Sequence, residues 1–337
     1  MIPLSVLDLA PISEGSDAGT ALRNARDLAQ AVERFGYKRF WMAEHHSMPG
    51  IASAATAVAL CFAAEGTSSI RIGAGGIMLP NHSPLQVAEQ FGTLEALFPG
   101  RIDLGLGRAP GTDQAASYAM RRNISSQHQF PDDVVELMAY FQPAEPGQRV
   151  RAIPGEGLDV PVWILGSSLY GAQLAAQLGL PYAFASHFAP QMMMDALATY
   201  RRSFQPSAWL DRPYAMLGFN VFAAETEEKA RLLATSVQRA FVELRTGMPG
   251  QLKPPVPGYA DTLPLEQRAM LEMLLTCSAV GSPDTVREAT MKFIERTGAD
   301  ELMVTSQIYD HASRIRSYEL LAECLSLKDD SKQLAAS

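Results

Sequence analysis

Hydrophobic residues along the chain alternate between short runs typical of buried strands and longer stretches with helical spacing. The first short run, Leu4–Leu9, is followed by an amphipathic helical pattern over Ala18–Phe35. The same order of strand and helix repeats toward the C-terminus. The eight expected strands are Leu4–Leu9, Arg39–Glu44, Ile70–Ile77, Ile102–Gly107, Val160–Gly166, Tyr182–Ser186, Ala215–Ala223 and Glu301–Ser306.

Eight strand–helix units predict an α/β fold, the (β/α)8 TIM barrel. An open doubly wound sheet is the competing layout, but this number of units fits it less naturally. Serine residues with the character of N-caps, Ser53, Ser83 and Ser282, indicate three helix starts. The expected helices include Ala52–Glu65 and Leu85–Leu97, which follow the first two of these serines, and Thr226–Arg245.

The chain is expected to form a single domain over residues 1–328, followed by a polar tail at 329–337. Two stretches interrupt the regular alternation. Residues 109–130 follow the fourth strand, and a connection of this length is expected to be a lid over a binding site. Residues 246–281 are expected to be an insertion before the last unit, and its first part, Thr246–Asp261, is rich in proline and glycine and is expected to be irregular.

The composition indicates a folded enzyme rather than a disordered chain, because 47% of residues are hydrophobic and 19% are charged. A net charge of −8 argues against a nucleic-acid partner. The three cysteines are widely spaced and lack a CxxC motif, which predicts neither a disulfide framework nor structural zinc. No basic, apolar leader and no run of about 20 apolar residues occurs, so a cytoplasmic protein without a membrane partner is expected.

In such a barrel the active site lies at the carboxyl ends of the strands, where the loops to the helices converge. All six histidines fall at or after an expected strand end. Polar residues are common in loops, but imidazoles and glycines gathered on one rim favour a ligand site. The polar strand ends are Glu44–His46, Gly75–Gly76, Gly107–Arg108, Gly166–Ser168, Ser186–His187 and Ser306–Gln307.

The adjacent pair His45 and His46 raises the question of a metal site. Neighbouring strand residues point to opposite faces, and a two-ligand site on one strand needs His-x-His, which does not occur. No metal site is therefore predicted. Alternation places His45 on the same face as Trp41 and Ala43, and this face is the better candidate for the barrel mouth. His45 is thus predicted to give or take a proton near neutral pH.

Two neighbouring strand ends indicate a phosphate site. Gly107 permits close approach of a flat ligand to the backbone, and Arg108 can hold a phosphate as a bidentate fork. The segment Gly166–Ser168 lies between an apolar strand and an expected helix, where backbone N–H groups and hydroxyls bind anions. An ordinary serine N-cap explains the serines alone, but the pairing with Arg108 favours a phosphate-bearing ligand.

These motifs together resemble the bacterial luciferase-like flavin-dependent monooxygenases, and the similarity extends over nearly the whole chain. A subgroup of short luciferase-like oxidoreductases is most similar, through Leu7–Pro11 and Leu79–Pro84. The segments that carry the resemblance are Phe40–His46, Ile72–Pro80, Pro99–Arg108, Val162–Ser168 and Gly281–Pro283.

The resemblance implies a (β/α)8 barrel that binds FMN or reduced FMN in its mouth. Arg108 and Ser167 then contact the phosphate, with Gly107, Gly166 and Ser168 alongside. His45 matches the family's catalytic histidine, and Glu44 is its catalytic neighbour. The resemblance also implies that Gly75–Gly76 forms a non-prolyl cis peptide beneath the isoalloxazine ring.

The resemblance further implies an FMN-dependent oxidoreductase, a monooxygenase that uses reduced FMN and O2 on a small organic substrate. Electrons come indirectly from NAD(P)H, with a separate flavin reductase as a partner, and a homodimer is expected. The luciferase catalytic subunit has a cysteine where this chain has Gly107, so light emission is not implied. Two alternatives stay open: hydride transfer by a deazaflavin (F420)-dependent oxidoreductase, and a non-catalytic flavin-binding protein.

Overall fold

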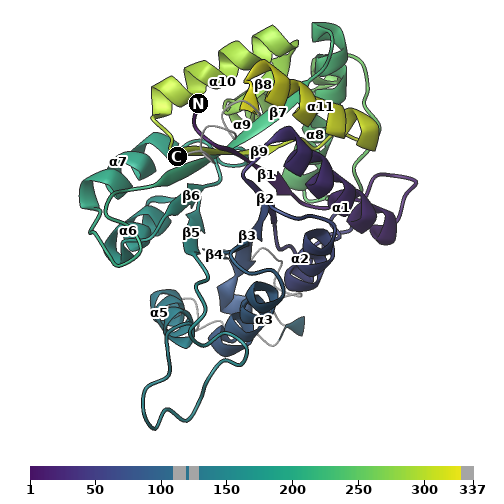
Figure 1. Cartoon of the computed structure of the whole chain (residues 1–337). Helices are drawn as coiled ribbons and strands as arrows, with labels where there is room; N and C mark the ends of the chain where they lie inside the picture. Colours follow the sequence, from purple (N-terminus) through teal and green to yellow (C-terminus); the bar gives the residue numbers. More distant parts are fainter. Residues whose placement is uncertain (109–118, 121–128, 328–337) are drawn as a thin grey trace.

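Eight parallel strands close into a barrel, which confirms the (β/α)8 fold predicted from the sequence (Figure 1). The computed structural model describes residues 1–108, 119–120 and 129–327. The strand order is β6-β5-β4-β3-β2-β1-β9-β7, and pairing of β6 with β7 closes the ring. The barrel strands are β1 (Leu4–Asp8), β2 (Arg39–Met42), β3 (Arg71–Met78), β4 (Ile102–Gly107), β5 (Val162–Gly166), β6 (Tyr182–Phe184), β7 (Ala215–Ala223) and β9 (Glu301–Thr305).

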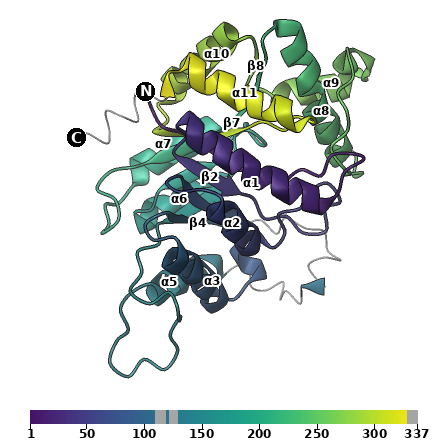
Figure 2. The same ribbon diagram turned by 45° about the vertical axis from the view of Figure 1, so that its right-hand side comes forward.

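Helices surround the barrel, and the first and last of them, α1 and α11, lie side by side (Figure 2). Helix α1 begins where the Asp17 carboxylate accepts the Thr20 N–H at 2.8 Å, and it ends at Gly36, whose φ of 91° favours glycine. The surrounding helices are α1 (Ala18–Phe35), α2 (Thr56–Glu65), α3 (Pro84–Leu97), α5 (Phe130–Tyr140), α6 (Leu169–Leu178), α7 (Met193–Ser203), α8 (Glu227–Arg245), α10 (Pro283–Thr297) and α11 (His311–Cys324).

The start of α2 differs from the prediction. This helix begins at Thr56 rather than at Ser53, because the Ser53 hydroxyl is engaged elsewhere. It donates to the backbone oxygen of Ala43 at 2.5 Å, and it lies 3.2 Å from that of Leu9. Ser53 therefore joins the ends of β1 and β2 instead of capping a helix.

The segment 246–281 is irregular over most of its proline-rich first half, as predicted, and regular in its second half. Its second half contains the 3-10 helix η3 (Tyr259–Thr262), helix α9 (Leu265–Leu274) and strand β8 (Ser278–Gly281). Strand β8 pairs with the second half of β7, outside the closed ring. The proline-rich first half lies at the barrel rim, where the Leu252 N–H donates to the Ile12 backbone oxygen at 2.9 Å. The expected lid (109–130) and tail (329–337) fall largely or wholly outside the described residues.

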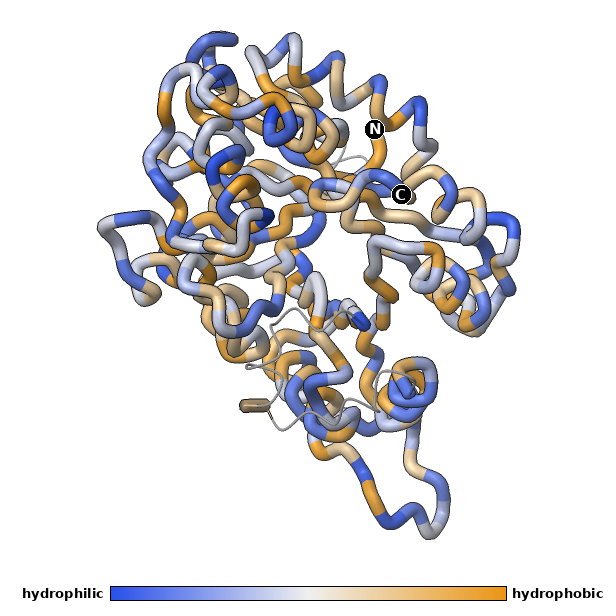
Figure 3. Tube along the Cα trace, turned by 180° about the vertical axis from the view of Figure 1, so that it is seen from behind, coloured by the Kyte–Doolittle hydropathy of each residue, from blue (hydrophilic) through white to orange (hydrophobic). Residues whose placement is uncertain are grey.

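The apolar core has one layer between strands and helices, one cluster inside the barrel and a third cluster between β7, α8 and α9. Figure 3 shows hydrophobic positions along the strands and hydrophilic ones on the outer turns of the helices. Inside the barrel, Trp41 and Trp163 meet edge to face, with ring centroids 5.3 Å apart. The inner cluster consists of Leu7, Trp41, Ala43, Trp163, Ala183, Met216 and Met303.

A buried ionic network lies at the amino ends of the strands and forms the barrel floor. Arg39 donates to Glu301 at 2.9 Å and to Asp103 at 2.7 Å. Asp103 also accepts the indole N–H of Trp41 at 3.1 Å, so the network orients the ring beneath the barrel mouth. Within the described residues, no helix combines the length and apolar character needed to span a membrane.

Candidate active site

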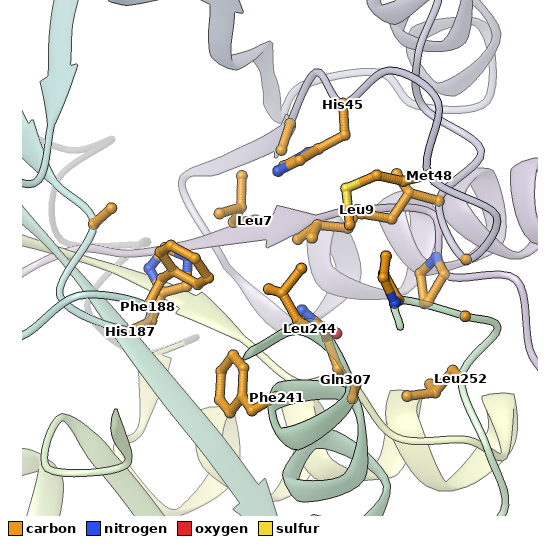
Figure 4. A pocket seen from close by; sticks show the side chains of 18 of the residues that line it. Leu7, Leu9, His45, Met48, His187, Phe188, Phe241, Leu244, Leu252 and Gln307 are labelled. Carbon is orange, nitrogen blue, oxygen red and sulfur yellow. The ribbon is translucent and has the colours of Figure 1, made fainter. Parts of the chain in front are cut away.

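A cavity of about 230 Å³ lies at the carboxyl ends of the barrel strands, where the sequence predicts the site (Figure 4). Its wall comes from the ends of β1, β2 and β3, from the loop after β6, from α8 and from the proline-rich segment. Of the predicted site residues, His45 and Gly75 line it. The strand ends, the helix and the insertion thus meet around one space in the barrel mouth.

His45 faces this cavity, as strand alternation predicts. Ala43 and His45 line the cavity wall, and Trp41 lies in the inner cluster beneath, whereas Met42 packs in the outer core. The Nδ1 atom of His45 is buried and has no hydrogen-bond partner among the described residues. Burial lowers the pKa of His45, although the Glu44 carboxylate acts in the opposite direction. The imidazole is therefore mainly neutral at pH 7, with a nitrogen free to bind a ligand.

Glu44 points away from the cavity and joins two strand ends. Its Oε1 lies 2.6 Å from Nε2 of His46 and 2.8 Å from Nε2 of His82, and its Oε2 accepts the Met78 N–H at 3.2 Å. Burial alone would raise the pKa of Glu44, but the hydrogen bonds from the two histidines outweigh it and leave the pKa lowered. Glu44 is thus a buried carboxylate that positions the loop carrying His45.

The side chains of Glu44, His46 and His82 place two imidazole nitrogens and a carboxylate oxygen within 4.8 Å of one another. Sequence reasoning considered the adjacent histidines and did not foresee that Glu44, His46 and His82 would meet. Hydrogen bonds already pair these groups with one another. The absence of a metal site stays a prediction.

The peptide bond of Gly75–Gly76 is cis, as predicted. The two residues lie where the register between β3 and β4 shifts. A Cβ on Gly75 would lie 2.8 Å from a methyl carbon of Leu7, and one on Gly76 would lie 2.7 Å from the backbone oxygen of Gly105. A side chain at Gly76 would therefore meet backbone and one at Gly75 would displace Leu7, and Gly75 presents bare backbone to the cavity.

The predicted phosphate residues come together at the ends of β4 and β5. Gly107 pairs in register with Leu165, the residue before Gly166. The exposed Arg108 guanidinium lies 4.0 Å from the ring centroid of Tyr170, in the first turn of α6. This helix begins after Ser168, whose side chain makes no capping hydrogen bond. A cation and an uncapped helix N-terminus therefore lie side by side, and both attract anions.

The glycines at this place are not required by protein packing. A Cβ on Gly107 would meet nothing closer than 3.9 Å, and one on Gly166 nothing closer than 3.7 Å, among the described residues. Space is thus left beside Arg108 that a ligand can use. These residues form a group separate from those that line the cavity of about 230 Å³.

Sequence reasoning did not select two polar residues of the cavity, His187 and Gln307. Burial lowers the pKa of His187 to about 4, and the nearby His45 acts in the same direction. Both residues belong to the polar strand ends of the sequence, Ser186–His187 and Ser306–Gln307, but the sequence assigns neither a role. That signal did not distinguish them from other loop residues, because the tertiary packing decides which of these side chains face the cavity.

A closed eight-stranded β/α barrel with ligand-binding groups at its carboxyl rim defines a TIM-barrel enzyme. The family model described as luciferase-like monooxygenase matches residues 2–301, and the chain belongs to that family. It is 52% identical to a luciferase-like monooxygenase of Escherichia coli (strain K12) over 320 residues, which cover 95% of this chain and 96% of the relative. It is 35% identical to the N-acetyl-S-alkylcysteine monooxygenase of Bacillus subtilis over 254 residues, covering 73% and 75%.

Solved structures agree with this assignment. The crystal structure of apo-MsnO8 matches with a TM-score of 0.86 and 36% identity, covering 97% of this chain and 99% of the other. The oxygenating constituent of 3,6-diketocamphane monooxygenase, from Pseudomonas putida and in complex with FMN, shares the fold (TM-score 0.70, 20% identity, covering 96% and 97%). So does an F420-dependent secondary alcohol dehydrogenase (TM-score 0.68, 13% identity, covering 96% and 99%). The fold alone therefore accommodates either type of cofactor.

Proposed function

We propose that the protein is an FMN-dependent monooxygenase that uses reduced FMN and O2 to oxidise a small organic substrate. The observation that carries this proposal is the position of Arg108 beside the N-terminus of α6. A guanidinium next to free backbone N–H groups fits the phosphate of FMN in charge and in hydrogen-bonding capacity. The space left beside Gly107 and Gly166 gives that group room.

The site residues have two roles, which are to hold the cofactor and to handle a proton. Arg108, Ser167 and Ser168 hold the phosphate, and the bare backbone of Gly75–Gly76 supports the flat ring of the cofactor. The cofactor supplies the chemistry that activates O2. His45 holds or moves a proton through its unpartnered Nδ1, a task suited to an imidazole that is neutral at pH 7. The apolar wall of the cavity keeps water away from the reaction.

Two other functions have the same fold. A deazaflavin-dependent oxidoreductase would transfer hydride without O2, and a flavin-binding protein would do no chemistry. The unpartnered nitrogen of His45 in the cavity favours an enzyme over a storage protein, because a buried polar atom without a partner is costly unless a ligand uses it.

The test compares cofactors on the purified protein. Calorimetry measures the affinities of FMN, reduced FMN and a deazaflavin, and an oxygen electrode measures O2 uptake with NAD(P)H and a flavin reductase. We expect reduced FMN to bind and O2 uptake to depend on both the protein and the reductase. Tight deazaflavin binding without FMN binding would identify the hydride-transfer class, and flavin binding without any turnover across a substrate panel would identify a binding protein.

We also propose that the protein is a homodimer that receives reduced FMN from a separate reductase using NAD(P)H. Helix α2 supports the dimer because its sequence is apolar on nearly every side, which is typical of a helix buried all round. In one chain, however, Val58 is 72% exposed and Phe62 is 39% exposed. A second copy packed against α2 would remove these side chains from water.

A further inference from the structure

The cavity in the barrel mouth is lined mostly by apolar groups. None of the described residues that line it is Asp, Glu, Lys or Arg. Its polar side chains are His45, His187 and Gln307, and Figure 4 shows them among leucine, methionine and phenylalanine side chains. A charged ligand would therefore lose its hydration in this space without gaining a counter-ion, which costs several kilocalories per mole.

His187 is neutral and has an unused hydrogen-bonding atom. No described residue forms a hydrogen bond with either ring nitrogen: Nδ1 is buried against Gly218, which leaves Nε2 for a ligand, and Nδ1 of His45 is likewise buried without a partner. Burial lowers the pKa of His187 to about 4, so its imidazole carries no charge at pH 7. A neutral imidazole offers one donor and one acceptor. It can therefore bind a carbonyl or a hydroxyl group but gives no charge to a carboxylate.

The fold holds His187 in a defined place. The side chain of Asn220 donates to the His187 backbone oxygen at 2.8 Å, and the Ser186 hydroxyl donates to the Gly218 backbone oxygen at 2.6 Å. A Cβ on Gly218 would lie 2.0 Å from Nδ1 of His187. The ring therefore lies directly against β7 at a position where only glycine leaves it room.

His187 also lies where two spaces meet. Besides the main cavity it lines a smaller one of about 40 Å³, together with Trp41, Met216 and Met303 of the inner cluster. Leu7 and Gly75 line both spaces as well. A substrate that packs against a cofactor ring seated over Gly75 thus has His187 within the same wall.

We propose that this cavity binds an uncharged, mainly apolar substrate that carries one hydrogen-bonding group, and that His187 binds this group together with His45. The inference rests on the proposed function, because it takes the cavity as the substrate end of the cofactor site. His187 becomes a substrate-binding residue that sequence reasoning did not select.

Three probes of similar size test the proposal: acetophenone, benzoate and ethylbenzene. Calorimetry at pH 7 measures their binding to the whole protein, with and without FMN, and requires no turnover. We expect acetophenone to bind at least about tenfold more tightly than benzoate, because benzoate must bury an unpaired charge. Equal or tighter binding of benzoate would overturn the proposal. A failure to bind FMN would overturn the proposed function instead, since the probe preference is measured independently of the cofactor.

Variants then assign the polar contact. We expect His187→Leu to weaken acetophenone binding about threefold to tenfold and to leave ethylbenzene binding within about twofold. His311→Leu, which removes an imidazole outside the cavity lining, is the matched control and should change neither. Equal losses for both probes in His187→Leu would show that His187 merely packs, and would refute its assigned role.

Two further variants do not depend on the folding of His187→Leu. Gly218→Ala keeps the imidazole but displaces it, and we expect the same selective loss of acetophenone binding. Leu244→Arg adds a cation to the cavity wall, and we expect it to raise benzoate affinity at least about fivefold. Unchanged benzoate affinity in Leu244→Arg, in a folded variant, would contradict the view that missing charge sets the preference.

Discussion

The guanidinium of Arg108 lies 4.0 Å from the ring centroid of Tyr170, which places the cation at the end of β4 over the first turn of α6. The contact holds a flexible side chain beside the helix N-terminus before any ligand arrives. Pre-ordering of this kind lowers the entropy that binding costs. The pair therefore gives the proposed phosphate site a rigid cationic side.

Removal of the Arg108 cation should weaken the binding of a flavin that carries a phosphate and leave the binding of a flavin without one unchanged. A charge-assisted hydrogen bond contributes about 1.5–3 kcal/mol, so we expect Arg108→Ala to weaken FMN binding about tenfold to a hundredfold. Riboflavin lacks the phosphate, and its affinity should stay nearly unchanged. Arg108→Lys keeps the charge and should lie between wild type and Ala. If riboflavin and FMN lose affinity equally, Arg108 does not bind the phosphate.

The ionisation of Glu44 should make the unfolding free energy of the protein depend on pH in the acidic range. Its pKa in the folded protein is lowered, so its ionised form contributes stability above the unfolded pKa of about 4.3, and this contribution disappears as the pH falls through the lower folded pKa. We expect Glu44→Gln to lose about 1–3 kcal/mol of unfolding free energy at pH 7, because it weakens the bonds to His46 and His82.

Urea unfolding at a series of pH values measures this effect. The difference between wild type and Glu44→Gln should shrink as the pH falls below about 4.3. A difference that stays constant down to the acid limit would mean that the charge of Glu44 is not what stabilises the fold.

The strand pattern could be predicted from the sequence because buried apolar runs dominate it. The expected strand Ile102–Gly107 coincides with β4, and each of the eight expected strands corresponds to a barrel strand. Strand β8, Ser278–Gly281, was missed because it is short and depends on pairing with β7. The sequence predicts a cap at Ser53 because its hydroxyl can bond a helix N–H, but in the structure this hydroxyl bonds the backbone oxygens of Leu9 and Ala43, just beyond β1 and β2.

The site residues likewise fall into those that local patterns predict and those that depend on contacts between distant segments. His45 could be placed on the cavity side from alternation along β2, which depends on local geometry alone. The position of His187 depends on Gly218, which lies on the next strand and leaves room for its ring. The meeting of Glu44 with His82 depends on how the ends of β2 and β3 are joined. Such contacts between distant segments cannot be read from local patterns.

The exposed apolar side chains of α2 predict how the dimer can be separated. Val58 is 72% exposed in one chain, and Val58→Asp would place a charge inside the proposed interface, where it has no partner. We expect this variant to sediment as a monomer in analytical ultracentrifugation while keeping its circular dichroism spectrum. Leu265→Asp, at an 81% exposed position on α9, is the control and should sediment like wild type. A wild-type protein that is already monomeric would contradict the proposed dimer.

The adjacent histidines should differ in their effect on turnover. His45 faces the cavity with an unpartnered nitrogen, whereas His46 bonds Glu44 and lies outside the cavity lining. We expect His45→Ala to keep FMN affinity within a few-fold, because the phosphate anchors the cofactor, yet to lower turnover by about 10²–10⁴-fold. His46→Ala should stay within about tenfold of wild-type turnover, since it removes one of several bonds to a positioning carboxylate.

Steady-state rates of O2-dependent substrate oxidation, measured with saturating reduced FMN, compare the two variants. Full activity in His45→Ala together with an inactive His46→Ala would move the catalytic role to His46, and the proton transfer would then have to take place beside Glu44 rather than in the cavity.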